Sequence, residues 1–264
     1  MGNLDSGFGL LAATAAVRRL RPDADLVLSF DPEGMPWGPR TPEDVTARAL
    51  AVAEAAAARR PDVLIVGCNT ATVNSLTALR ARLEPGIPVV GTVPAIKPAA
   101  AGGGPVAIWA TPATTGSAYQ RGLIADFADG VPVTEVPCWG LAEAVEHADR
   151  TAVDTAVRAA AELTPDDVTT VVLGCTHYEL VADRIRTAVQ RPGAAPLALH
   201  GSAGAVAAPA RRRIGARPAP DAPATGTVTV LLNGREGELP AAALSYAEGR
   251  LLQTVAPAGP AVSR

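Results

Sequence analysis

The sequence predicts an α/β protein made of two pseudo-symmetric parallel-sheet domains, and two observations carry this prediction. Short apolar runs rich in β-branched residues alternate with longer helical patterns along the chain, and strands separated by helices imply a parallel sheet with right-handed crossovers. A stretch is also repeated, because residues 61–69 read PDVLIVGCN and residues 166–176 read DDVTTVVLGCT. Each copy places a cysteine at the carboxyl end of a strand, where open α/β sheets bind ligands. We therefore expect the active site in the cleft between the two domains.

The clearest single element is a helix expected over residues 41–60. Thr41 can cap its N-terminus, Pro42 takes the first helical position, and a pair of arginines suits its C-terminus. Pro61 ends this helix, and the apolar run 62–67 that follows is typical of a buried parallel strand. The same criteria predict further strands at residues 88–91, 105–110 and 168–174, and further helices at residues 71–83, 117–127, 141–163 and 180–190.

These elements suggest three parts of the chain. The first α/β domain is expected to comprise residues 1–95 plus 205–216, and the second residues 96–204. Residues 217–264 are expected to form a Pro/Ala-rich linker and a C-terminal extension. Within the extension, a strand-like VTVLL run precedes an Asn233-Gly234 turn signal, a helix is expected over 240–253, and the last eleven residues are expected to be frayed.

Charge and cysteine content exclude several classes of protein. The 23 Lys and Arg against 26 Asp and Glu leave a formal net charge of −3, whereas nucleic-acid-binding domains are usually basic. No run of about 18 apolar residues is present, so no transmembrane helix is expected, and the first basic residue, Arg18, lies too far along for a secretory signal. Three cysteines are too few for a disulfide framework, and no Cys or His pair has zinc-ligand spacing. We expect a cytoplasmic protein without a metal, a nucleic-acid partner or a membrane partner.

Cys68 and Cys175 are the candidates for chemistry, although free cysteines are also common as small buried core residues. Each is predicted to follow a strand and to precede a helix, whose N-terminus lowers a thiol pKa from about 8.5 and favours the thiolate. Two such thiols would face each other across the cleft. Lys97 is the only lysine and hence the only candidate for a pyridoxal phosphate Schiff base. It lies away from any glycine-rich phosphate-binding pattern, so we expect no such cofactor.

Seven motifs make the chain resemble the glutamate racemase family from Asp5 to about Ile214. In chain order they are Asp5-Ser6-Gly7, Pro36-Trp37-Gly38, Cys68-Asn69-Thr70-Ala71, Val93-Pro94-Ala95-Ile96-Lys97-Pro98, Ala110-Thr111-Pro112-Ala113-Thr114, Pro137-Cys138-Trp139-Gly140-Leu141 and Gly174-Cys175-Thr176-His177-Tyr178. The resemblance implies cofactor-independent interconversion of L- and D-glutamate, which supplies D-glutamate for peptidoglycan, and a homodimer. One thiolate removes the Cα proton and the opposite thiol returns a proton to the other face, as inversion at a carbon requires.

The resemblance also implies roles for single residues. Cys68 deprotonates the D-enantiomer and Cys175 the L-enantiomer. Asp5, at the end of a short first strand, assists Cys68, and His177 tunes the protonation of Cys175. The residues expected to contact the substrate are Asp5, Ser6, Trp37 and Gly38 through backbone N–H groups, Asn69, Thr70, Thr114, Thr176 and His177.

Two further side chains near these motifs have more than one interpretation. Glu146 matches a family carboxylate near the second cysteine, and a solvated helix charge is an equally good interpretation. Cys138 lies outside both thiol motifs, and we expect it to be structural.

The sequence departs from the family at several positions. Trp37 stands where a tyrosine is expected, Gly201 where an aspartate is expected, and Glu179 where a proline is expected, while a double glycine is reduced to Phe8-Gly9. These departures leave two alternatives open. One is a two-thiol racemase of another amino acid or of a hydantoin, and the other is a weakly active homologue with a binding or regulatory role.

Overall fold

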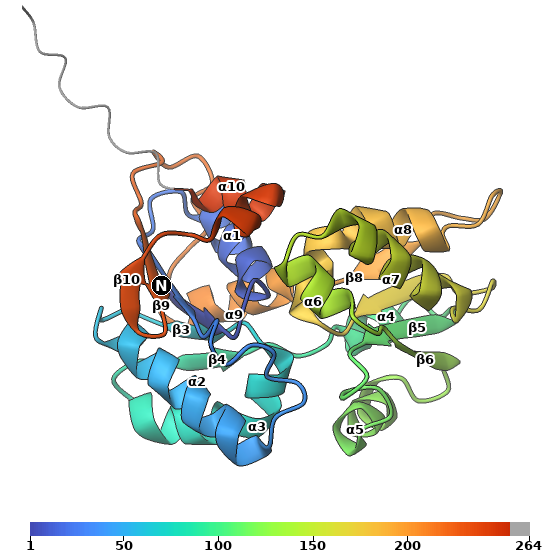
Figure 1. Cartoon of the computed structure of the whole chain (residues 1–264), viewed down its shortest axis with the longest axis horizontal. Coiled ribbons are helices and arrows are strands. Elements are labelled where there is room, and N and C mark those ends of the chain that lie inside the picture. Colours follow the sequence, from blue (N-terminus) through green and yellow to red (C-terminus); the bar gives the residue numbers. More distant parts are fainter. Residues whose placement is uncertain (254–264) are drawn as a thin grey trace, which may run out of the picture.

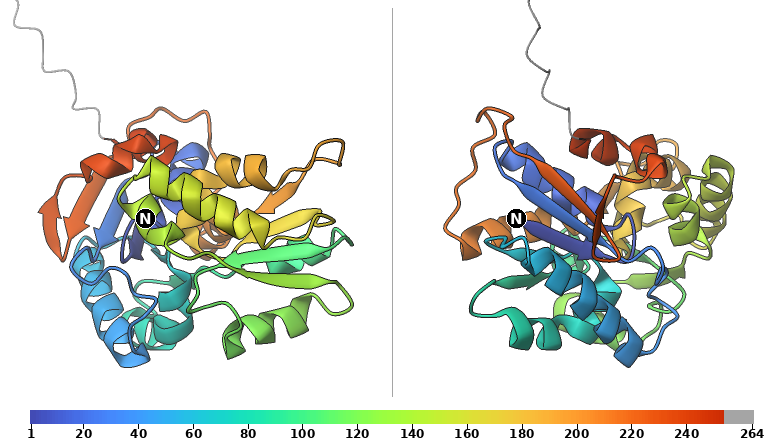
Figure 2. Two further views of the ribbon diagram at one scale, coloured as in Figure 1. Left: turned by 45° about the vertical axis from the view of Figure 1, so that its right-hand side comes forward. Right: turned by 60° about the vertical axis from the view of Figure 1, so that its left-hand side comes forward.

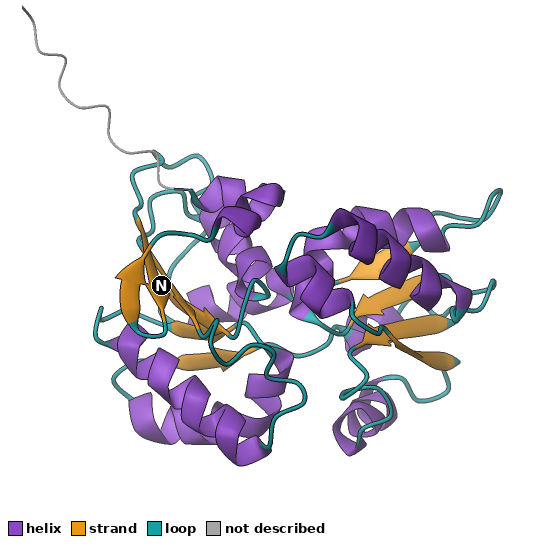
Figure 3. Ribbon diagram, in the orientation of Figure 1, coloured by secondary structure: helices purple, strands orange, loops and turns teal. Residues whose placement is uncertain are grey.

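The computed structural model describes residues 1–253, and the predicted fraying of the last eleven residues lies outside this range. Two groups of strands lie side by side, each with helices packed on both faces (Figure 1, Figure 3). All strand pairs are parallel except the β9–β10 hairpin. The predicted α/β class with two parallel sheets is therefore confirmed.

The first sheet has the strand order β10-β9-β2-β1-β3-β4. Its strands are β1 (Gly2–Asp5), β2 (Leu26–Phe30), β3 (Leu64–Val66), β4 (Val89–Gly91), β9 (Val228–Leu232) and β10 (Arg235–Gly237). One face packs against α2 (Pro42–Ala57) and α3 (Asn69–Leu83), and the other against α1 (Leu10–Leu20) and α9 (Ala203–Arg213). The sheet is thus covered by helices on both sides, as parallel sheets require.

The second sheet has the order β6-β5-β7-β8. Its strands are β5 (Val106–Ala110), β6 (Val133–Pro137), β7 (Thr170–Leu173) and β8 (Ala198–His200). Its helices are α4 (Ile96–Ala100), α5 (Ala118–Phe127), α6 (Leu141–Glu146), α7 (Arg150–Glu162), the 3₁₀ helix η1 (Thr176–Val181) and α8 (Ala182–Val189). Trp109 is fully buried within the core that α6, α7 and α8 cover.

Residues 217–264 were expected to form a linker and an extension apart from the two domains. Part of this segment instead belongs to the first sheet. After an irregular stretch, β9 pairs in parallel with β2, and the Asn233-Gly234 turn then leads into β10. Both turn residues have positive φ angles, 48° and 79°, as the type I′ turn of a two-residue hairpin requires. The views in Figure 2 show these C-terminal strands beside the N-terminal ones. β9 covers the edge of β2, which would otherwise expose unpaired backbone groups.

Two long predicted helices are broken in the structure. The segment 141–163 divides into α6 and α7 because Ala148 adopts a positive φ of 52° and the Asp149 side chain accepts a hydrogen bond from Ala152 N (3.0 Å). Residues 240–253 divide at Tyr246, whose backbone is extended, into the 3₁₀ helix η2 (Ala241–Ser245) and α10 (Ala247–Leu252). The sequence patterns do not predict α1, β2, α4, β6, β8 and α9. None of the helices among residues 1–253 is long and apolar enough to cross a membrane.

Candidate active site

A cavity of about 250 Å³ lies between the two sheets, at the carboxyl ends of their strands. It is lined by the segments that follow β1, β3, β5 and β7, together with residues 35–39 and 138–143. The structure brings almost all predicted site residues to this cavity. Those that line it are Asp5, Ser6, Trp37, Gly38, Cys68, Asn69, Thr70, Thr114, Cys175, Thr176 and His177.

The repeated Gly-Cys pair has a steric basis in both halves. A Cβ atom on Gly67 would lie 3.0 Å from the Leu10 Cα, and one on Gly174 would lie 2.8 Å from the Trp109 carbonyl oxygen. Glycine therefore lets each strand end pass close to neighbouring backbone. Each cysteine then takes the position before a helix, α3 for Cys68 and the 3₁₀ helix η1 for Cys175. The second thiol thus precedes a short 3₁₀ turn instead of the expected α-helix.

The first thiol is paired with a buried carboxyl group. Cys68 is 8% exposed, and the charge of the Asp5 carboxyl group acts on its thiol. Burial raises the pKa of Asp5 to about 6, against the opposing charge of His177 and a hydrogen bond from Ser6 N (2.6 Å). Burial and then the charge of Asp5 raise the pKa of the Cys68 thiol well above its ordinary value. Cys68 therefore holds its proton firmly beside a carboxyl group that can accept it.

The second thiol is paired with a buried imidazole. Cys175 Sγ lies 3.8 Å from His177 Nδ1, and His177 Nε2 lies 3.0 Å from Glu146 Oε2. Burial alone would lower the pKa of His177, but its hydrogen bonds with Cys175 and Glu146 outweigh this effect and raise it well above 6.5. The imidazole therefore lies between the Cys175 sulfur atom and the Glu146 carboxylate. The Glu146 side chain is only 15% exposed, so the interpretation of Glu146 as a solvated helix charge is wrong.

Three hydrogen bonds connect the two thiol environments directly. Asn69 Nδ2 donates to the Gly174 carbonyl oxygen (2.8 Å), and Thr176 Oγ1 donates to Asp5 Oδ2 (3.4 Å). Glu146 Oε2 accepts a hydrogen bond from Phe8 N (2.7 Å). Asn69 Oδ1 is buried and has no hydrogen-bond partner among the described residues, so this oxygen is free to accept one from a ligand.

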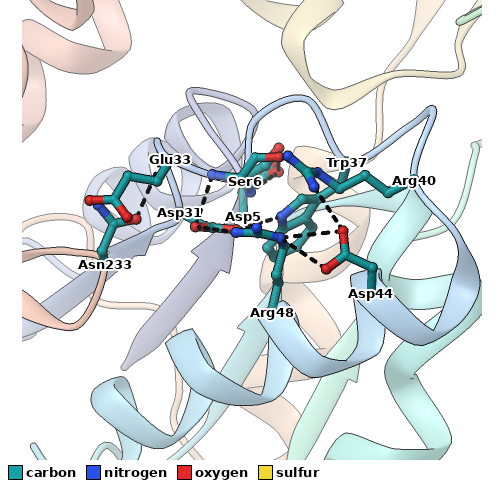
Figure 4. A network of polar contacts seen from close by, with 10 residues as sticks. Asp5, Ser6, Asp31, Glu33, Trp37, Arg40, Asp44, Arg48 and Asn233 are labelled. Atoms are coloured by element: carbon teal, nitrogen blue, oxygen red, sulfur yellow. Dashed lines mark hydrogen bonds and ion pairs between the residues drawn. The ribbon is translucent and has the colours of Figure 1, made fainter.

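Trp37 belongs to a polar network that shapes the segment beside the cavity (Figure 4). Its indole is almost fully buried in the core between the first sheet and helices α2 and α3, and Nε1 donates to Asp31 Oδ2 (2.8 Å). Asp31 also accepts hydrogen bonds from Gly34 N (3.1 Å) and from Arg48 Nη1 (3.2 Å). The buried tryptophan ring and its hydrogen bond therefore hold residues 31–40 in place. This gives the departure from the family at position 37 a structural reason.

Two further departures, Glu179 and Gly201, compensate each other. Glu179 Oε1 accepts hydrogen bonds from Ser202 N (2.8 Å), Ser202 Oγ (2.9 Å) and Ala203 N (3.0 Å), at the N-terminus of α9. A Cβ atom on Gly201 would lie 2.3 Å from Glu179 Oε2, so glycine at 201 makes room for this carboxylate. Neither residue lines the catalytic cavity, and we find no contact through which the pair would select a substrate.

Cys138 and Trp139 are among the cavity residues that were not in the predicted site. Cys138, which was expected to be structural, lines the cavity although it is 2% exposed. Trp139 also lines it and is 72% exposed, so its ring stands at the rim. Each belongs to a family-like motif, but local sequence carries no signal for its distance from the thiols. Within residues 1–253, no group of three or more His, Cys, Asp or Glu side chains is arranged to hold a metal ion.

The fold and the cavity together define a two-domain α/β enzyme with one thiol on each side of its active site. The family model described as Asp/Glu/Hydantoin racemase matches residues 10–203. The chain is 38% identical over 191 residues to a glutamate racemase of Roseiflexus sp. (strain RS-1), covering 70% of each chain. It is 34% identical over 222 residues to a glutamate racemase of Pseudomonas putida (strain W619), covering 82% of each.

A solved structure agrees with these relatives. The crystal structure of Escherichia coli glutamate racemase in complex with L-glutamate and the activator UDP-MurNAc-ala has a TM-score of 0.72 at 30% identity. The match covers 83% of this chain and 84% of that one. The chain belongs to the Asp/Glu/hydantoin racemase family and is an amino-acid racemase, which confirms the family resemblance of the sequence.

Proposed function

We propose that this enzyme interconverts L- and D-glutamate with Cys68 and Cys175 as its two acid/base groups and without a cofactor. The observation that carries the proposal is the pair of thiols lining one cavity, each with its own ionisable neighbour. The names of the relatives from Roseiflexus and Pseudomonas support glutamate as the substrate.

In the direction from L to D, the Cys175 thiolate takes the Cα proton and the Cys68 thiol donates its proton to the opposite face. One C–H bond breaks as another forms, and no electrons leave the substrate. In the reverse direction Cys68 acts as the base, assisted by Asp5, and Cys175 as the acid. Each proton transfer of this kind contributes about 10²–10⁴-fold to a rate.

The two carboxylates of glutamate would be bound mainly by neutral groups. Within the described part of the chain, no Lys or Arg lines the cavity. Hydroxyl groups do line it, and α3 begins at Asn69 beside Cys68. Backbone N–H groups at a helix N-terminus attract anions. The hydroxyl groups are those of Ser6, Thr70, Thr111, Thr114 and Thr176.

The overall reaction is tested with either pure enantiomer of glutamate. The protein is dialysed exhaustively against a chelator and then followed by circular dichroism. Both enantiomers should approach the same racemic mixture, and no pyridoxal phosphate or metal should be needed. A strict requirement for an added cofactor would overturn the proposal, and turnover of aspartate in place of glutamate would change the substrate.

The roles of the two thiols are tested with Cys68→Ser and Cys175→Ser. Serine cannot supply the thiolate at neutral pH, so each variant should lose at least about a thousandfold in racemisation, or about 4 kcal/mol in the barrier. In heavy water, Cys68→Ser should still exchange the Cα proton of L-glutamate, and Cys175→Ser that of D-glutamate, as read by proton NMR. Near-normal racemisation by either variant contradicts the two-thiol mechanism.

We further propose that the enzyme is a cytoplasmic homodimer that supplies D-glutamate for peptidoglycan. Its three cysteines are all free, and free thiols persist in reducing compartments. Sedimentation velocity of the pure protein should give a dimer. Cells that lose the gene should need D-glutamate to grow, and growth without it would contradict the assigned role.

A further inference from the structure

The C-terminal segment reaches the part of the molecule that carries Glu146. The Tyr246 hydroxyl, between η2 and α10, donates a hydrogen bond to the Val145 carbonyl oxygen (2.5 Å). Burial, and then the charge of Glu146, raise the pKa of Tyr246 to about 12, so the hydroxyl stays protonated and can donate. Val145 precedes Glu146, the last residue of α6. A residue from the C-terminal segment therefore holds the end of the helix that carries the carboxylate.

Phe8 completes a closed set of contacts around this point. Its backbone N–H donates to Glu146 Oε2 (2.7 Å), and its ring packs edge-to-face on Tyr246, with centroids 6.4 Å apart and an interplanar angle of 69°. The same Glu146 oxygen lies 3.0 Å from His177 Nε2. The carboxylate is thus fixed through Phe8, and its helix through Tyr246.

We propose that Tyr246 is a positioning residue for the Cys175 side of the active site and acts through Glu146 and His177. The inference rests on the proposed two-thiol mechanism. α6 has only six residues, and the carbonyl groups of a helix's last turn lack partners within the helix. Without the tyrosine hydroxyl, the Val145 carbonyl oxygen keeps its hydrogen bond from Ala148 N (3.0 Å) but loses its contact with the C-terminal segment, so the end of α6 is held less firmly. A displacement of about 1 Å at a catalytic group can cost about a hundredfold in rate.

The contacts predict an effect on one thiol more than on the other. Tyr246 reaches Cys175 through Val145, Glu146 and His177, all joined by covalent or hydrogen bonds. The charge of Asp5 acts on the Cys68 thiol. Asp5 accepts hydrogen bonds from Ser6 and Thr176 and makes none with Tyr246 or Glu146 among the described residues. Loss of the hydroxyl should therefore slow deprotonation of the L-enantiomer selectively.

The test adds Tyr246→Phe to the two single-thiol variants and measures Cα deuterium exchange in heavy water. With Cys68→Ser, exchange of L-glutamate should fall at least tenfold when Tyr246→Phe is added. With Cys175→Ser, exchange of D-glutamate should fall less than twofold. Tyr119→Phe is the matched control, since its buried hydroxyl has no hydrogen-bond partner among the described residues, and it should change neither rate.

The outcomes separate the inference from the mechanism on which it rests. If Tyr246→Phe lowers both exchange rates equally, or lowers neither, Tyr246 is only structural and the inference is overturned. If Cys68→Ser itself exchanges neither enantiomer, the two-thiol mechanism is wrong, and the inference falls with it. Melting temperatures of all variants show whether a loss of folding explains a common decrease.

Discussion

The two thiols occupy equivalent positions after their strands but have chemically different partners. Cys68 is buried beside the carboxyl group of Asp5, which comes from a different strand of the same sheet. Cys175 is paired with His177, two residues further along the chain, and His177 is backed by Glu146 from α6. A carboxylate disfavours a neighbouring thiolate, and an imidazolium favours it. The repeated strand and Gly-Cys pair therefore reproduce the position of the sulfur, while non-repeated residues decide its chemistry.

After the thiol variants, the largest expected effect comes from removing the imidazole on the second side. His177→Gln should slow Cα deuterium exchange of L-glutamate by at least about a hundredfold, the lower range for a lost acid/base group. Exchange of D-glutamate at early times should fall by less than about tenfold, because Cys68 and Asp5 are intact. His147→Gln, at an exposed histidine, is the control. An equal decrease for both enantiomers would remove the distinction between the two sides.

The carboxyl group on the first side should show its cost in stability. Because the pKa of Asp5 is raised from 3.8 to about 6 in the folded protein, its stabilising contribution is full below about pH 4 and is lost as the pH rises through about 6. The shift corresponds to about 3 kcal/mol. Asp5→Asn should remove this pH dependence, so that above pH 7 the variant gains stability relative to the wild type while it loses activity.

The measurement is the difference in unfolding free energy between Asp5→Asn and the wild type, from urea titrations at pH 4, 6 and 8. The difference should move in favour of the variant as the pH increases. Asp129→Asn, at an exposed acid, serves as the control and should show no such trend. A difference that stays constant from pH 4 to pH 8 would mean that Asp5 is not strained by its burial.

A smaller effect concerns the contact between the Glu179 carboxylate and the N-terminus of α9. Gly201→Ala should destabilise the protein by about 1–3 kcal/mol, because the added Cβ meets the Glu179 carboxylate. Glu179→Ala removes that carboxylate, so the double variant should be more stable than the sum of the single effects predicts. Gly204 lies in α9, and a Cβ atom added there would meet nothing within 4 Å. Gly204→Ala should therefore stabilise the protein by about 0.5–1 kcal/mol. Additive effects at 179 and 201 would contradict the compensation.

The smallest effect compares one buried tryptophan from each half. Trp37→Phe loses a hydrogen bond to the Asp31 carboxylate, whereas Trp109→Phe loses one to the Thr164 hydroxyl. Bonds to charged groups are worth about 1.5–3 kcal/mol and neutral ones about 1 kcal/mol, so Trp37→Phe should be the more destabilising by chemical denaturation. Of these two tryptophans, Trp37 lines the cavity and Trp109 does not, so Trp37→Phe should raise KM and Trp109→Phe should leave it unchanged. A larger KM change for Trp109→Phe would contradict the assignment.

Much of the fold was predictable from local patterns, and the family resemblance supplied nearly half of the residues that line the cavity. The buried strands at 62–67, 105–110 and 168–174 are found as β3, β5 and β7, since apolar β-branched runs bounded by glycine or proline are strong local signals. The break at Ala148 and the division at Tyr246 were missed, because a capping aspartate or an extended residue competes with helix propensity only in its tertiary context. The C-terminal strand was seen, but its partner β2 was not.

By itself, the sequence determined two α/β halves and two cysteines at strand ends, because hydrophobic period and glycine positions act over a few residues. Only the tertiary structure decided which side chains serve each thiol. Glu146 meets His177 across 31 positions, Tyr246 meets Val145 across 101, and Glu179 meets Ser202 across 23. Such hydrogen bonds depend on how helices pack on different sheets, to within a few tenths of an ångström, and no spacing along the chain specifies that distance.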